Sequence, residues 1–210
     1  MQVDLWFPVT GRTLPSDHGY AMYGALSRAV PKLHDADDWG LHTLRGKALG
    51  PGIISLSQSP RLGLRLPAEQ ISTVLSLCGR TLEVRGHFIG LGSPTVITLS
   101  PHAALSARLV TIKSFMEPDP FIAAVRRQVA ELHPRCAEGN VTIGARKIVT
   151  VGGQKVVGFS IRVSGLSDEA SLALQEHGIG GRRKMGCGVF RKSEHRLAVD
   201  ARPAPKESAA

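Results

Sequence analysis

The pattern that most constrains this chain is the order of its strand-like and helical segments, because the same order occurs twice in 210 residues. In the first half, helical spacing of apolar residues occurs over residues 20–30 and 67–78. Apolar and polar residues alternate over residues 61–66, which is the period of a half-buried strand. Further strand-like runs lie at residues 3–9, 39–44, 53–56, 81–84, 88–91 and 96–99.

The second half repeats this order with a clearer signal. A strand-like run at 105–112 precedes an amphipathic helix that begins at Pro118 and ends before Pro134. Two long strand-like runs then flank Gly152 and Gly153, which predicts a hairpin. A short helix up to His177 and a last strand at 189–190 follow.

Each half therefore has approximately the β-α-β-β-α-β order of the ferredoxin-like unit. We predict an α+β fold with two tandem ferredoxin-like lobes, residues 1–100 and 101–195, the second of which carries a C-terminal glycine-rich loop. Residues 196–210 are rich in Pro, Ala, Ser and Lys, and we expect a disordered tail there. A single mixed α+β domain is the alternative, because no residues align between the two halves.

The charge of the chain points to a polyanionic partner. Lys and Arg (26) minus Asp and Glu (17) give +9, and the balance is 9 − 7 = +2 for residues 1–100 but 17 − 10 = +7 for residues 101–210. A basic surface concentrates polyanions and speeds their capture, although it can also serve solubility alone. No run approaches the roughly 20 apolar residues of a membrane span, and residues 1–4 show no secretory signal. We therefore expect a cytoplasmic protein with no membrane association.

The cysteines give no sign of a disulfide framework or a zinc site. There are three of them, Cys78, Cys136 and Cys187, with wide spacing and no CxxC pair. The acidic run at 35–38 has no partner His or Cys at metal-ligand spacing, so it is more typical of a solvated loop. We expect neither a metal ion nor another cofactor.

Residues 178–190, GIGGRRKMGCGVF, combine five glycines with three adjacent cations. Glycine permits close approach to a ligand, and exposed N–H groups can form an anion-binding concavity. A helix precedes this segment and a strand follows it, which is the reverse of a dinucleotide-binding motif. A glycine-rich turn with solvated charges is the alternative to RNA-backbone contact. The residues predicted to bind RNA are Gly178, Gly180, Gly181, Arg182, Arg183, Lys184, Gly186, Gly188, Arg191 and Lys192.

The helix and loop at the C-terminus resemble a known family. SLALQEH at 171–177 followed by GIGGRRKMGCGVF is similar to the C-terminal signature of the CRISPR repeat-cleaving endoribonucleases of the RAMP superfamily. LPSDHGY at 14–20 is similar to the branch found with myxobacterial-type type I systems. The resemblance covers residues 3–190. It implies two ferredoxin-like lobes, binding of CRISPR repeat RNA (often a hairpin), one cut per repeat, and a link to other subunits of an interference complex.

RNA cleavage of this type uses the ribose 2′-hydroxyl as the nucleophile and needs no cofactor. A general base takes the hydroxyl proton, a general acid protonates the leaving 5′-oxygen, and cations stabilise the charge that develops between them. Imidazole suits both proton-transfer roles. We therefore expect metal-independent cleavage that leaves a 2′,3′-cyclic phosphate and a 5′-hydroxyl.

The candidate catalytic residues are His18, Tyr20, Tyr23, His34 and His42. His18 leads, because the family often keeps a histidine at the first helix and because this helix begins beside the chain's only two tyrosines. Asp17 is expected to cap the helix or to orient the imidazole. The three histidines are close in sequence and could line one cleft, although each alone is as readily an ordinary surface histidine.

Two other functions stay open at this point. One is a non-catalytic RNA-binding subunit of a CRISPR ribonucleoprotein, and the other is a scaffold that binds proteins through an exposed sheet edge. An aromatic content of 5% argues against a base-stacking platform. Structured repeat RNA in EDTA separates the three functions, because the enzyme cuts it, the binder only retards it, and the scaffold does neither.

Overall fold

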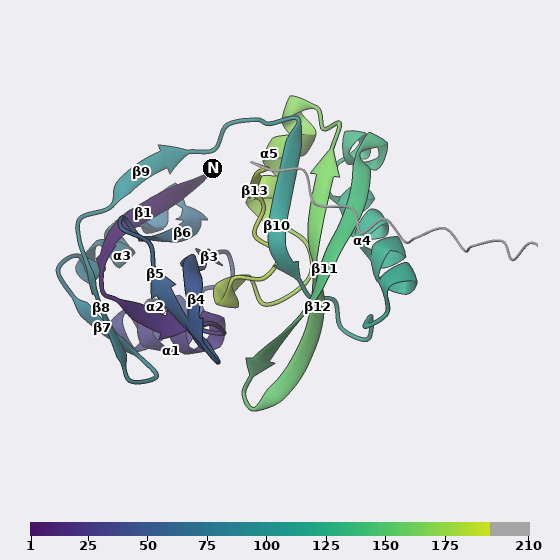
Figure 1. Cartoon of the computed structure of the whole chain (residues 1–210). Coiled ribbons are helices and arrows are strands. Elements are labelled where there is room, and N and C mark those ends of the chain that lie inside the picture. The colour runs from purple at the N-terminus through teal and green to yellow at the C-terminus, as the bar shows by residue number, and fades with distance from the viewer. Residues whose placement is uncertain (194–210) are drawn as a thin grey trace, which may run out of the picture.

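The computed structural model describes residues 1–193, so the expected tail at 196–210 lies outside the described residues. The chain forms two side-by-side lobes, each with a sheet and helices (Figure 1). The prediction of an α+β fold is confirmed. Within residues 1–193, no helix has the length and apolar content needed to cross a membrane.

The first sheet runs in the order β3-β6-β1-β8-β7, and β9 also pairs with β1. Its strands are β1 (Gln2–Thr10), β3 (Gly40–His42), β6 (Arg61–Pro67), β7 (Thr81–Val84), β8 (His87–Leu91) and β9 (Thr95–Thr98). The alternation in β6 places Leu62, Leu64 and Leu66 in the core. The opposite face of β6 is buried as well, because the second lobe covers Arg65.

The helices of the first lobe are α1 (Gly19–Ala29) and α2 (Lys32–Asp35). The helix expected at 67–78 is instead three short turns: η1 (Ala68–Gln70), α3 (Ile71–Val74) and η2 (Leu75–Leu77). Ser and Thr hydroxyls compete for backbone groups in this segment, as Ser76 Oγ does by donating to the Thr73 carbonyl. A separate small sheet has the order β2-β5-β4, formed by β2 (Thr13–Pro15), β5 (Ile53–Leu56) and β4 (Gly46–Gly50).

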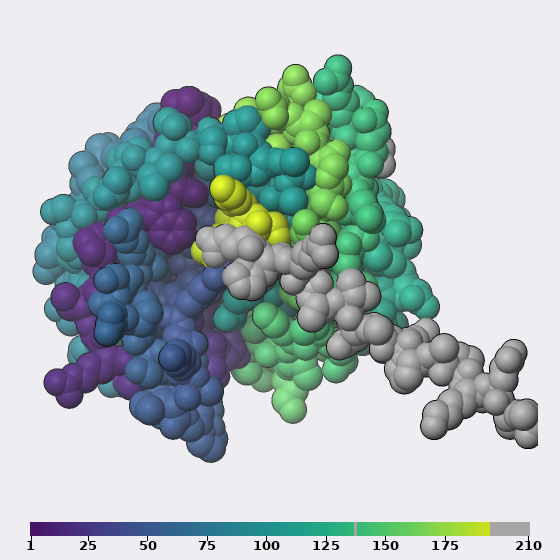
Figure 2. All heavy atoms as spheres, turned by 45° about the horizontal axis from the view of Figure 1, so that its top comes forward, coloured from purple at the N-terminus to yellow at the C-terminus, as the bar shows by residue number. Residues whose placement is uncertain are grey.

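The second sheet has the order β11-β12-β10-β13. Its strands are β10 (Ala104–Val110), β11 (Asn140–Val151), β12 (Gln154–Ser164) and β13 (Arg191–Lys192). The helices of the second lobe are α4 (Pro118–Leu132), η3 (Pro134–Glu138), α5 (Asp168–His177) and η4 (Arg183–Met185). The last strand begins two residues later than predicted, and the Phe190 carbonyl accepts from the Arg65 side chain instead of from a neighbouring strand. In the space-filling view, the final described residues (yellow) lie between the two lobes (Figure 2).

Each lobe has its own hydrophobic core. Phe7, Leu26 and Leu64 belong to the first core, and Phe121 and Phe159 to the second, where their rings lie 4.7 Å apart. Burial of such side chains contributes roughly 1.5–3 kcal/mol each. The two cores share no residue, and buried polar contacts join the lobes between them.

Arg65 makes the most deeply buried of these contacts. Its Nε and one terminal nitrogen each donate to the Asp4 carboxylate at 2.8 Å. Its other terminal nitrogen donates to the carbonyls of Gln175 (2.8 Å) and Phe190 (2.6 Å) in the second lobe. Burial would raise the pKa of Asp4, but hydrogen bonds from His42 and Arg65 outweigh it and hold this pKa well below its usual range.

We predict that Asp4→Asn lowers the free energy of unfolding by about 3–5 kcal/mol, because it leaves the Arg65 charge buried without its counter-ion. Urea denaturation measures this. The matched control is Glu131→Gln, which breaks the exposed Arg127–Glu131 pair on α4 and should cost at most about 0.5 kcal/mol. Small and equal losses in both variants would contradict a structural role for the Asp4–Arg65 pair.

Candidate functional site

Helices α1 and α2 form an open groove of about 760 Å³ on the first lobe. Tyr20, Tyr23 and His34 line it, so three of the five predicted catalytic residues come together. Tyr20 and Tyr23 are three positions apart, which places them on one face of α1. The chain turns at Pro31 into α2, and this turn brings His34 next to Tyr23.

Tyr23 and His34 form a hydrogen-bonded pair. Tyr23 Oη lies 3.0 Å from Nδ1 of His34, and the rings stack with centroids 6.0 Å apart. The buried Trp39 supports this pair, because its ring stacks on Tyr23 and its Nε1 donates to the Leu33 carbonyl in α2 at 2.9 Å. The His34 side chain is exposed. Since Nδ1 is engaged, Nε2 is the ring nitrogen that a ligand can reach.

Arg28 and Arg85 add two cations to the groove, and the sequence reasoning missed both. Arg28 lies eight positions after Tyr20, on the same face of α1, so helical periodicity could have predicted its place in the groove. Arg85 could not be found in that way, because it lies in the distant turn between β7 and β8. It has a φ of 50°, in the left-handed region that non-glycine residues rarely adopt.

Lys184 joins the second lobe to the groove. Its Nζ donates to the carbonyls of His34 (3.1 Å) and Ala36 (2.9 Å) and to the Asp37 carboxylate (2.9 Å). It also lies 5.8 Å from the centre of the Tyr23 ring. The hydrogen bond from Lys184 and its charge lower the pKa of Asp37. This lysine, predicted to bind RNA, therefore holds α2 in place through its contacts with the first lobe.

His18 lies outside the groove, and the three predicted histidines do not share one cleft. Its side chain is 1% exposed, and its Nδ1 donates to the Pro15 carbonyl at 2.8 Å. Burial lowers its pKa and favours the neutral ring, and Nε2 is buried with no hydrogen-bond partner among the described residues. Asp17 does not cap α1 as expected, because its Oδ2 accepts from the Thr150 N–H in β11 at 2.6 Å.

His42 is also buried and belongs to the contact between the lobes. Its Nε2 lies 3.1 Å from Asp4 Oδ1, and its ring stacks on Trp6 with centroids 4.8 Å apart. Burial lowers its pKa, although Asp4 opposes this effect. His42 and Arg191 line a second concave region, between the two lobes.

The five glycines of residues 178–190 do not form the expected open anion site. Four of them, Gly178, Gly180, Gly186 and Gly188, have φ between 65° and 84°, which favours glycine. The N–H groups of all five glycines already donate hydrogen bonds within the protein. Taken in chain order from Gly178 to Gly188, the acceptors are Leu174 O, Gln128 Oε1, Thr111 O, Arg183 O and Leu109 O. The exposed-amide interpretation is therefore wrong, and the glycines serve close packing of the loop.

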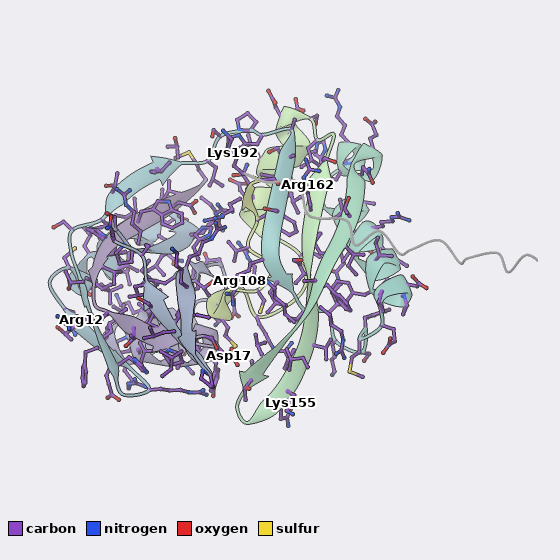
Figure 3. All side chains as sticks on the ribbon, viewed as in Figure 1. Arg12, Asp17, Arg108, Lys155, Arg162 and Lys192 are labelled. Atoms are coloured by element: carbon purple, nitrogen blue, oxygen red, sulfur yellow. The ribbon has the colours of Figure 1, made fainter. Side chains whose placement is uncertain are left out.

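The cations of this segment point in different directions. Arg183 donates to the Glu176 carbonyl at 2.7 Å, and burial lowers its pKa to about 10. Arg182 lines a separate depression with Lys113 and Arg127. Lys192 is exposed on β13, at the end of the sheet away from Lys155 (Figure 3). In residues 1–193, no group of three or more His, Cys, Asp or Glu residues could hold a metal ion.

Known proteins with similar sequences and folds give this geometry a context. A family model described as Cas6 Crispr matches residues 3–195. The CRISPR-associated endonuclease Cas6 of Myxococcus xanthus (strain DK1622) is 43% identical over 188 residues, which are 90% of this chain and 80% of that protein.

Solved structures share the fold at low sequence identity. The product of a Cas6-related gene from Pyrococcus furiosus has a TM-score of 0.68 and 12% identity, with 93% of this chain and 99% of that chain covered. Thermus thermophilus Cse3, bound to an RNA that represents a pre-cleavage complex, has a TM-score of 0.53 and 15% identity, with 91% and 98% covered.

We predict that Gly19→Ala lowers the melting temperature, because a Cβ at Gly19 would clash with the Met185 carbonyl oxygen in η4. Alanine is otherwise better than glycine in a helix by about 1 kcal/mol. Gly24→Ala in the same helix is the control, because its Cβ would meet only the end of the Arg28 side chain, at 3.4 Å. It should raise the melting temperature. Equal shifts by circular dichroism would show that α1 and η4 can separate without cost.

Proposed function

The chain belongs to the Cas6 family of CRISPR-associated endonucleases, and from this premise we propose that it binds precursor CRISPR RNA and cleaves it within its repeats without a metal ion. The observation that carries this proposal is the exposed Tyr23–His34 pair in a groove that also holds two arginines. These residue types supply proton transfer and charge stabilisation without any cofactor.

The proposed reaction begins with the 2′-hydroxyl of the nucleotide just 5′ of the cut. Its oxygen attacks the adjacent phosphorus, its proton goes to a base, and the bond from phosphorus to the 5′-oxygen breaks as that oxygen takes a proton from water. In the tautomer in which His34 Nδ1 donates to Tyr23 Oη, the Nε2 lone pair accepts the hydroxyl proton. Arg28 and Arg85 oppose the charge on the phosphoryl oxygens. The products are a 2′,3′-cyclic phosphate and a 5′-hydroxyl.

We place the proton transfer at His34 rather than at His18. A general base must come within hydrogen-bond reach of the proton that it removes. His34 is exposed, whereas His18 is 1% exposed and holds the start of α1 against Pro15. His42 is similarly enclosed by Asp4 and Trp6. Tyr20 lines the groove one turn before Tyr23 and is 37% exposed, so it is placed to contact the RNA.

We also propose that the lobes are two ferredoxin-like units, residues 1–100 and 101–195. The orders β3-β6-β1-β8 and β11-β12-β10-β13 support this, because each places the first strand of its unit between the third and the fourth. A hairpin of β4 and β5 is then an insertion in the first unit. The proposed setting is the cytoplasm, with repeat RNA as the partner and other subunits of an interference complex as further ones.

RNA contact outside the groove is proposed for the remaining cations of the C-terminal segment. Arg182, Arg191 and Lys192 are not used to hold α2, whereas Lys184 is. The glycines of this segment act through the loop shape that they permit. Replacing Lys184 would therefore disturb the lobe contact as well as any RNA contact, whereas replacing Arg183 would remove its hydrogen bond to Glu176 within the second lobe.

We predict that His34→Gln binds repeat RNA but cleaves it at least roughly a hundredfold more slowly, because a general base contributes about 10²–10⁴ in rate. Tyr23→Phe should give a smaller loss. Single-turnover cleavage with enzyme in excess measures both. His133→Gln, at the end of α4 in the second lobe, is the control and should cut at the parental rate. If folded His18→Gln is inactive while His34→Gln cuts normally, the assignment to His34 is wrong.

We predict that cleavage persists in EDTA and stops when the nucleotide 5′ of the cut is deoxyribose, because the nucleophile is then missing. End-group analysis of the products should find a cyclic phosphate or its 3′-phosphate hydrolysis product. A requirement for magnesium, or cleavage of the deoxy substrate, would refute the mechanism. Retardation of the ribose RNA without any cleavage would instead favour a non-catalytic RNA-binding subunit.

A further inference from the structure

The short acidic run at the end of α2 contains one carboxylate that the described part of the chain does not use. Asp37 accepts from Lys184 at 2.9 Å, and both oxygens of Asp38 accept from the Gln70 side-chain amide at 3.0 Å. Asp35 differs from both, because it lines the groove of α1 and α2. Among the described residues its carboxylate has no hydrogen bond and no ion pair. Asp35 is therefore the member of this run that is free to contact a ligand in the groove.

A carboxylate does not suit a groove that contacts only the backbone of an RNA. Arg28 and Arg85 line this groove and attract phosphate groups. Asp35 repels them, and it is the one carboxylate among the lining residues in the described part of the chain. The part of the RNA that contacts Asp35 must therefore offer hydrogen-bond donors, which a phosphate diester lacks.

The donors that RNA offers are the ribose 2′-hydroxyl and the N–H groups of the bases. A hydroxyl has a single hydrogen, whereas a carboxylate accepts through two oxygens. Guanine presents two parallel N–H donors on its Watson–Crick edge, from N1 and from the 2-amino group. On the same edge, adenine and cytosine present one amino group beside a ring-nitrogen acceptor, and uracil presents one N–H between two carbonyl oxygens. Guanine is therefore the base that can donate to both carboxylate oxygens at once.

Tyr20 supplies an aromatic surface for a base in the same groove. It lines the groove from α1, and its side chain is 37% exposed. The Tyr23 ring is already stacked on His34 and Trp39, whereas the Tyr20 ring has no aromatic partner among the described residues. An aromatic ring binds the face of an unpaired base by stacking, with little preference between bases. Tyr20 can therefore hold a base whose edge is then read by a hydrogen-bonding side chain.

We propose that Tyr20 and Asp35 bind an unpaired guanine next to the cut, and that Asp35 determines which base is accepted there. The position next to the cut follows from His34, whose Cα is about 3.8 Å from that of Asp35 and whose side chain lines the same groove. This position rests on the proposed function, in which His34 takes the proton of the attacking 2′-hydroxyl. The selection of guanine rests on Tyr20 and Asp35 and does not require cleavage.

Binding of repeat RNAs with one base changed at a time tests this proposal. Each unpaired position near the cut carries guanine, inosine, adenine, cytosine or uracil in turn, and deoxyribose at the cut prevents cleavage. At one position the parent should bind the guanine RNA at least roughly fivefold more tightly than the inosine RNA, because a bidentate contact to a base discriminates by at least about this factor. Inosine differs from guanosine only by the missing 2-amino group, so this comparison isolates the second hydrogen bond.

Four variants separate the two roles. Asp35→Asn should bind the guanine and inosine RNAs equally, because an amide has one acceptor oxygen and turns its own N–H groups toward the base. Asp35→Glu keeps a carboxylate and should keep a weaker preference for guanine. Tyr20→Leu should weaken binding of every base but keep the ratio between guanine and inosine. The control Glu131→Gln removes one negative charge from an exposed position on α4 and should keep the preference of the parent.

The melting temperature of Asp35→Asn should equal that of the parent, because the side chain is exposed and has no partner among the described residues. A guanine preference that persists in Asp35→Asn would overturn the role of Asp35. Equal affinities of the parent for all bases at every position would overturn the guanine site, and sensitivity to the 2′-hydroxyl alone would assign Asp35 to the ribose instead. Failure of the parent to cut ribose RNA would overturn only the proposed function, since binding is measured on uncut RNA.

Discussion

The guanidinium of Arg65 is buried at the junction of four segments, and the docking of the lobes depends on it. It extends from β6 to Asp4 in β1, to the Gln175 carbonyl in α5 and to the Phe190 carbonyl before β13. A lysine has three donors on one nitrogen and could not match this planar arrangement. The same carboxylate accepts from His42 and so fixes the Trp6–His42 stack. A buried ion pair can cost as much as it contributes, but here the charge also satisfies two main-chain carbonyls between the lobes.

Local periodicity predicted most of the elements and none of their long-range partners. The alternation in residues 61–66 and the apolar face of residues 118–132 reflect burial against a single neighbouring surface, so the sequence records them directly. Strand β4 was missed because it is exposed along its length and has no alternating apolar pattern. The pairing of Asp4 with Arg65, 61 positions away, left no local signal, because polar residues in a strand are ordinarily predicted to face solvent.

In the candidate site too, the sequence predicted local neighbours but not contacts between the lobes. Helical spacing placed Tyr20 and Tyr23 together, and the turn at Pro31 made His34 a reasonable third member. The spacing could not show that the second lobe covers the start of α1, where Met185 lies against Gly19 and Thr150 bonds to Asp17. That coverage buries His18 and leaves His34 as the accessible histidine. The sequence also could not show that the neighbouring cations of residues 178–190 point to different parts of the surface. They do so because the chain turns at each residue with a left-handed conformation.

The bond from the Thr150 N–H to Asp17 has a mechanical consequence. The β11–β12 hairpin extends well beyond the rest of its sheet (Figure 1). A hairpin held only at its base could move freely at its tip. This hairpin is held at its base by the sheet and near its tip by the bond to Asp17. Rotation of one lobe against the other must therefore bend the hairpin or break the bond near its tip. The position of the start of α1, which carries both tyrosines of the groove, therefore depends on how readily the β11–β12 hairpin of the other lobe bends.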